Sequence, residues 1–183
     1  GALAGFFGGF FDALLSRVTD IFFAVPFVLA AIVVMQMFRN DRSILTVILV
    51  LALFGWPQIA RITRGSVMSV KNEDYVTASR ALGSGRMAML LRHVMPNAAA
   101  PIIVTATVEL GVFIVSEATL SFLGIGLPSS VVSWGADIAA AKEALNSHPS
   151  VLLFPAGALA LTVLGFIMLG DVVRDALDPK ARK

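Results

Sequence analysis

The chain has 183 residues, of which 57% are hydrophobic and 14% are charged, and its mean hydropathy is +0.86. Soluble domains are roughly half apolar and about a quarter charged. A soluble core could not bury so much apolar surface, so the composition excludes a water-soluble globular protein and indicates a polytopic membrane protein.

The charge and the residue types exclude several kinds of site. The net charge is only +2, whereas a nucleic-acid-binding protein concentrates basic residues on one face, so the charge does not indicate nucleic-acid binding. The chain has no cysteine, which excludes disulfides and thiol catalysis, and His93 and His148 lie far apart. Gly83 and Gly85 flank a serine, but no Gly-Lys-Ser/Thr sequence follows, so a P-loop is excluded. We therefore expect no catalytic residue, no metal and no cofactor.

The first eleven residues read GALAGFFGGFF and carry no positive charge before their apolar run. This pattern is not that of a signal peptide. We interpret residues 1–8 as the end of a hydrophobic helix, and the chain as a fragment that lacks its true N-terminus.

Four apolar stretches are long enough to cross a bilayer as helices, which takes roughly 20 residues each. The predicted spans are residues 18–38, 43–62, 98–118 and 149–170. A polar turn at 39–42 joins the first two. Residues 119–148 contain the glycine-broken stretch 121–128, Trp134 and a short amphipathic stretch at 136–146. A charged tail at 171–183 ends the chain.

Residues 63–97 are predicted to form an ordered loop. Residues 73–82 are good helix formers, and Gly83 supplies a C-terminal stop. A second amphipathic stretch at 87–95 is expected to end at Pro96, so the pattern predicts a helix, a turn and a second helix. Apolar positions would be exposed if this loop stood alone: Val76, Ala78, Ala81, Leu82, Leu90 and Leu91. The loop is either a helix on the anionic membrane surface or a docking helix for a cytoplasmic partner.

The distribution of Lys and Arg predicts the orientation. If residues 61–93 and the tail share one side, that side holds ten basic residues, and Arg17 at the same interface makes eleven. The opposite side then holds three, namely Arg39, Arg42 and Lys142. The sequence therefore predicts a cytoplasmic loop at 63–97, an extracytoplasmic segment at 119–148 and a cytoplasmic tail at 171–183.

Two glutamates, Glu109 and Glu117, fall in or beside the third span. Its nine Leu, Ile, Phe and Val residues from 102 to 115 contribute roughly −3 to −5 kcal/mol to insertion. One ionised residue near the centre costs about 2.5 to 3.5 kcal/mol, so two would nearly cancel that drive. Either the glutamates lie near the ends, or they face protein or water. We hypothesise that Glu109 faces the translocation pathway and that Glu117 helps to hold the 121–128 segment; both are pathway candidates.

Several motifs together resemble one family, the binding-protein-dependent ABC importer permeases. Residues 74–83 (DYVTASRALG) and 92–97 (RHVMPN) resemble its EAA loop. Residues 116–126 (SEATLSFLGIG), 133–135 (SWG) and the tail at 169–179 resemble the C-type permeases of dipeptide, oligopeptide and nickel importers. Thr77-Ala78-Ser79 replaces Glu-Ala-Ala, so no role of that glutamate carries over, and Met95 replaces the usual leucine.

The resemblance implies an all-α, type I ABC importer transmembrane domain (MetI-like) with a coupling-helix hairpin. It implies a permease subunit for peptides in a prokaryotic plasma membrane, with nickel or another small solute as the alternative substrate. The implied partners are a second homologous permease, two ATP-binding cassette subunits that hydrolyse the ATP, and an extracytoplasmic substrate-binding protein. The residues implied in coupling to the ATPase are Asp74, Tyr75, Thr77, Ala78, Ser79, Arg80, Ala81, Leu82, Gly83 and Pro96.

Two other classes remain as alternatives. A secondary transporter or channel would need ionisable residues on several spans, whereas here one span has them. A membrane scaffold or protease would need a Ser-His pair or an HExxH motif for proteolysis, and neither is present. Co-purification with an ATPase would distinguish the ABC permease from both.

Overall fold

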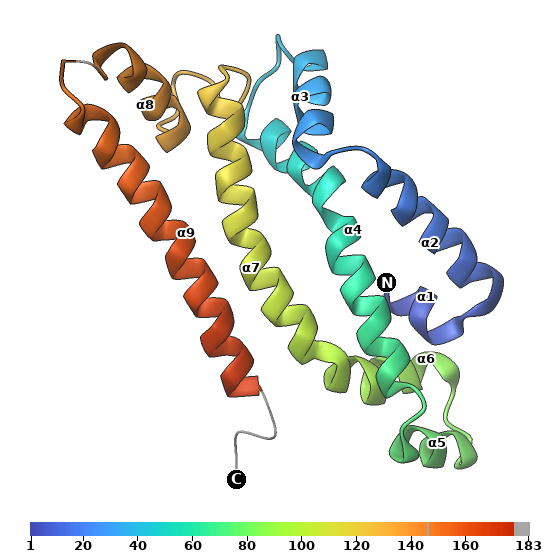
Figure 1. The fold of residues 1–183 in the computed structure, drawn as a ribbon. Coiled ribbons are helices and arrows are strands. Elements are labelled where there is room, and N and C mark those ends of the chain that lie inside the picture. Colours follow the sequence, from blue (N-terminus) through green and yellow to red (C-terminus); the bar gives the residue numbers. More distant parts are fainter. Residues whose placement is uncertain (146, 178–183) are drawn as a thin grey trace. The chain divides into compact units, whose positions relative to one another are not determined.

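The computed structural model describes residues 1–145 and 147–177, and the regular elements in that part of the chain are all helices (Figure 1). The predicted all-α fold is confirmed. The chain divides into two compact units: residues 1–24, 56–106 and 170 onward form the first, and residues 25–55 and 107–169 form the second. The helices α4 (Ile44–Val70) and α7 (Met95–Phe122) contribute residues to both.

Three helices are long and apolar enough to cross a membrane: α4, α9 (Ser150–Leu177), and the continuous helical run from residue 86 to 122 that ends in α7. The pair α2 (Gly9–Ala24) and α3 (Phe27–Met37) supplies a fourth if both count as one span. A helix of 27 residues is about 40 Å long, which exceeds the hydrocarbon thickness of about 30 Å. Three or four membrane-spanning elements are therefore available.

The stretch 18–38, predicted as one span, is not one helix. α2 ends at Ala24 and α3 begins at Phe27. Pro26 has φ −57° and ψ 123°, an extended conformation that cannot continue a helix. Proline also disfavours the helical conformation of the residue before it, so the break falls at Val25 and Pro26.

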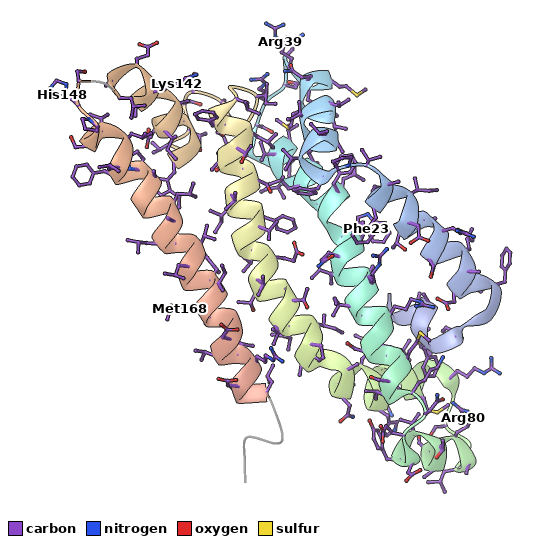
Figure 2. All side chains as sticks on the ribbon, viewed as in Figure 1. Phe23, Arg39, Arg80, Lys142, His148 and Met168 are labelled. Atoms are coloured by element: carbon purple, nitrogen blue, oxygen red, sulfur yellow. The ribbon has the colours of Figure 1, made fainter. Side chains whose placement is uncertain are left out.

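In the first unit, α2 is joined to α4 by two ion pairs. Arg64 donates to both carboxylate oxygens of Asp12, and Arg61 lies 3.2 Å from Asp20. The Arg61 guanidinium also stacks 3.9 Å from the ring centroid of Phe23, which Figure 2 labels on α2. Both arginines lie within α4, which continues to Val70, and both have partners on α2.

A small core lies at the end of α4 in this unit. Its residues come from α4, the following hairpin and the start of α7: Val67, Val76, Met89, Leu90, Val94 and Ala98. The short helix α1 (Ala2–Phe7) packs against it through Phe6, and Lys71 donates to the carbonyl oxygen of Gly5 at 2.7 Å. The hairpin is thus fixed to the helices that carry it.

In the second unit, α3 and residues 44–55 of α4 pack against the end of α7. The buried residues of this core are Ala31, Met35, Val47, Val50, Leu51, Leu120 and Ile125. Arg42 donates to the carbonyl oxygen of Gly124 at 2.5 Å, which links the turn before α4 to the turn after α7. α9 lies beside α7, where Val163 and Phe166 face Gly111.

The predicted amphipathic stretch 136–146 corresponds to α8 (Trp134–Ala141) and a 3₁₀ turn (Lys142–Ala144). Asn146 and residues 178–183 lie outside the described residues, and with them the Asp178-Pro179 part of the tail resemblance.

Candidate functional site

The hairpin at residues 71–97 contains α5 (Asp74–Ala81) and α6 (Arg86–Met89), and the helix predicted at 73–82 is present. α5 ends in a Schellman motif: the amide of Ser84 donates to the carbonyl of Ser79, and the amide of Gly83 donates to that of Arg80. Gly83 has φ +84°, a left-handed conformation that only glycine adopts without strain. The reversal of the hairpin thus depends on this glycine.

One face of α5 is turned into its own unit. Val76 is fully buried and packs in the core with Val67, Leu90 and Val94. Ser79, three residues further on, is also buried, and its hydroxyl donates to the hydroxyl of Ser84 at 2.9 Å. Positions three apart share a helix face, so this inner face fixes α5 to the ends of α4 and α7.

Beside this buried face, a second face of α5 that reaches the C-cap residue Leu82 is exposed. Tyr75, Ala78 and Leu82 follow the spacing of one helix face, and Leu82 is 87% exposed. Desolvation by partial burial and the neighbouring Glu73 carboxylate raise the pKa of Tyr75 above its usual range, so its phenol stays neutral. The surface formed by Tyr75, Ala78 and Leu82, here called the outer face of α5, is apolar with a single neutral hydroxyl.

The structure divides the residues that the resemblance implied in coupling. The exposed ones are Asp74, Tyr75, Thr77, Ala78, Arg80, Ala81, Leu82 and Gly83, with Arg80 labelled in Figure 2. Ser79 is buried, so it stabilises the hairpin. Of the apolar positions that would be exposed if the loop stood alone, Val76 and Leu90 are buried against the adjoining helices.

The second helix of the hairpin does not end at Pro96, contrary to the sequence prediction. α6 passes into a π-helical turn (Leu90–Val94) and then directly into α7, whose second residue is Pro96. Proline removes an amide donor and crowds the carbonyl four residues earlier, and the wider π turn before it gives that carbonyl room. Pro96 therefore lies within a continuous helical run, exposed at the start of α7.

A second polar cluster surrounds Glu117 near the end of α7. Its Oε1 atom accepts hydrogen bonds from the hydroxyls of Ser121, at 2.6 Å, and Ser133, at 2.9 Å. The hydroxyl oxygen of Ser121 also accepts a hydrogen bond from the amide of Leu127, and that of Ser133 accepts one from the amide of Gly135. This agrees with the expectation that Glu117 holds the 121–128 segment.

Close packing of α8 on α7 brings Ser133 to Glu117. Ser133 caps α8, and the next residue but one, Gly135, lies directly on the backbone of Ala118. A Cβ atom at Gly135 would overlap the carbonyl oxygen of Ala118, so only glycine permits this approach.

Glu109 lies in the middle of α7 and is half-buried. Among the described residues its carboxylate has no hydrogen bond or ion pair. Glu117 lines a recess together with Phe113 and Trp134, and Glu109 does not line it. The structure therefore does not bring the two pathway candidates to one site. Within residues 1–145 and 147–177, no group of three His, Cys, Asp or Glu side chains could hold a metal ion.

The sequence matches, over residues 1–183, the family described as binding-protein-dependent transport system inner membrane component. The chain belongs to this family. It is 42% identical over its whole length to the oligopeptide transport system permease protein OppC of Bacillus subtilis, covering 59% of that protein. It is 40% identical over 177 residues, 97% of the chain, to the glutathione transport system permease protein GsiD of Escherichia coli, covering 58% of it. The chain thus spans about three-fifths of the length of these relatives.

Proposed function

We propose that this chain is the larger part of a permease subunit of an ATP-driven peptide importer in a prokaryotic plasma membrane. Membership of an inner-membrane transport family supports the location and the general role. The names of two relatives, an oligopeptide permease and a glutathione permease, support peptides as the substrate class. The chain contributes helices to the path, and ATP is hydrolysed by partner subunits.

The observation that carries the proposal is the outer face of α5. Leu82 is 87% exposed and Tyr75 43% exposed, while the inner face of the same short helix is buried in its own core. A helix that is anchored along one face and has an exposed apolar surface beside it can transmit the rigid-body movement of a docked protein. We infer that an ATP-binding subunit covers the outer face and that loop 63–97 is cytoplasmic.

The proposed path needs a second permease chain. The three or four spanning elements described above cannot enclose a peptide-sized path and also shield it from lipid. α9 supports this, since none of its most apolar 18-residue window is buried within the chain. A second homologous permease and an extracytoplasmic substrate-binding protein complete the proposed assembly.

The test uses the complete transporter and two matched substitutions. Leu82→Glu places a charge on the outer face of α5, and Leu145→Glu makes the same change at an exposed leucine after the 3₁₀ turn. We expect Leu82→Glu to lose the ATPase subunits on affinity purification and to lose tripeptide uptake, and Leu145→Glu to retain both. Retention of the ATPase subunits and of uptake by Leu82→Glu would contradict the proposal.

A further inference from the structure

The second unit contains a recess beside Glu117 with a volume of about 600 Å³. Its walls are mainly apolar and include three aromatic side chains, Phe113, Trp134 and Phe166. Glu117 is the one lining residue that carries a charge. The recess thus combines a single carboxylate with several aromatic rings.

The two oxygen atoms of Glu117 have different surroundings. Oε1 accepts the hydroxyls of both Ser121 and Ser133, whereas Oε2 has no hydrogen-bond partner among the described residues. Within that part of the chain, Nε of Arg42 is the fully buried side-chain polar atom that lacks a hydrogen-bond partner. Oε2 of Glu117 also lacks a partner but is not fully buried, so it is accessible from outside the protein. Oε2 is therefore open to a donor that enters the recess.

The chemistry of the recess selects the kind of donor. Exposure of an ionised carboxylate to lipid costs free energy, so the recess must open to water or to another protein chain. A negative oxygen in a recess lined partly by aromatic rings favours a compact cation, because ring faces attract positive charge through their quadrupoles. An ammonium group meets both conditions and supplies up to three N–H donors.

Every peptide with a free amino terminus carries such a group. Resting on the proposed function, we propose that the recess beside Glu117 is a transient site for the ammonium group of the imported peptide. Oε2 receives the amine, while Oε1 and the two serines hold the carboxylate in place. Of the two pathway candidates, Glu109 and Glu117, it is Glu117 that lines the recess.

A substitution can separate the charge of Glu117 from its structural bonds. In Glu117→Gln the amide oxygen still accepts the hydroxyls of Ser121 and Ser133, but the negative charge is gone. Glu143→Gln is the matched control, since it makes the same change at an exposed glutamate that does not line the recess. The complete transporter, with both permeases, the ATPases and the binding protein, is assayed in proteoliposomes with radiolabelled trialanine.

We expect uptake of trialanine by Glu117→Gln to fall about tenfold, the size of effect that one charge-assisted contact gives. Subunit composition, and amide hydrogen exchange of residues 133–141, should match the wild type. Glu143→Gln should carry trialanine at the wild-type rate. An analogue in which the terminal amine is replaced by hydrogen gives a further comparison. For this analogue, uptake by Glu117→Gln divided by uptake by the wild type should be near one. The selectivity of the binding protein affects both rates equally, so it cancels in this ratio.

Several results would overturn the inference. One is wild-type uptake by Glu117→Gln. A second is faster amide exchange across α8 in that variant, which would assign Glu117 a structural role alone. A third is loss of the second permease, which would mean that the charge pairs with a neighbouring subunit. If the wild-type complex carries no trialanine, the proposed function fails instead, so the two failures are distinguishable.

Discussion

The carboxylate of Asp12 on α2 accepts two hydrogen bonds from the guanidinium of Arg64 on α4, at 2.5 Å from Nε and 2.7 Å from Nη2. This two-point geometry fixes orientation as well as distance. Eight residues further along α2, Asp20 meets Arg61 through one bond at 3.2 Å, with both side chains more than half exposed. The two pairs therefore hold α2 against α4 with unequal strength.

The inequality gives a first prediction. Asp12→Asn should lower the free energy of unfolding by about 1.5 to 3 kcal/mol, because a two-point bond to a charged partner is lost. Asp20→Asn should cost less than about 1 kcal/mol, as for exposed ion pairs. Thermal unfolding of the purified transporter measures both. Equal shifts in the unfolding temperature for the two variants would contradict the ranking.

A second prediction concerns the reversal after α5. Gly83→Val places a β-branched residue at φ +84°, which costs about 1 to 3 kcal/mol, and should abolish substrate-stimulated ATPase activity. Gly85→Val is the control, since Gly85 has φ −64° and ψ 145°, which valine adopts readily. ATPase assays on reconstituted transporters compare the two. Full stimulation in Gly83→Val would show that the turn is not needed for coupling.

A third prediction separates the two faces of α5. Val76→Ala removes two buried methyl groups from the core and should cost about 2 kcal/mol, so amide exchange across residues 74–82 should accelerate. Leu82→Ala removes an exposed side chain and should leave that exchange unchanged. Hydrogen-exchange mass spectrometry reads both. Protection that is the same in Val76→Ala as in the wild type would mean that the inner face does not hold the hairpin.

The local signals in the sequence predicted much of the hairpin. Residues 73–82 were expected to be helical, and the helix is Asp74–Ala81, because good helix formers are followed by a glycine in the position where a helix reverses. The face of α5 that is buried was not predictable. Val76 and Leu82 are both apolar, and only the position of Val67 and Val94 from other helices decides which of them is covered.

Breaks in long helices were harder to predict from the sequence. Pro26 interrupts one apolar stretch, whereas Pro57, Pro101 and Pro155 lie inside α4, α7 and α9 without ending them. Membrane helices tolerate proline where neighbouring groups compensate for the lost bond, and that compensation depends on tertiary contacts. The π turn before Pro96 is one such local adjustment.

The Glu117 cluster shows the same limit. The sequence indicated that Glu117 lies near the glycine-broken segment, and the serine at 121 is one helical turn away. Ser133 is sixteen residues distant, and it reaches Oε1 because Gly135 lets α8 lie on the backbone of α7. A contact that depends on such a close approach follows from packing and not from spacing.

The central claim is that the outer face of α5 docks on an ATP-binding subunit, and site-directed cross-linking tests it most directly. The chain has no cysteine, so Ala78→Cys and Leu145→Cys each introduce a single thiol on an exposed position. Both complexes are treated with a short thiol-to-amine cross-linker and resolved by mass. We predict a cross-link between the permease and the ATPase subunit from Ala78→Cys and none from Leu145→Cys. No such product from Ala78→Cys in an assembled, ATP-hydrolysing complex would contradict the account.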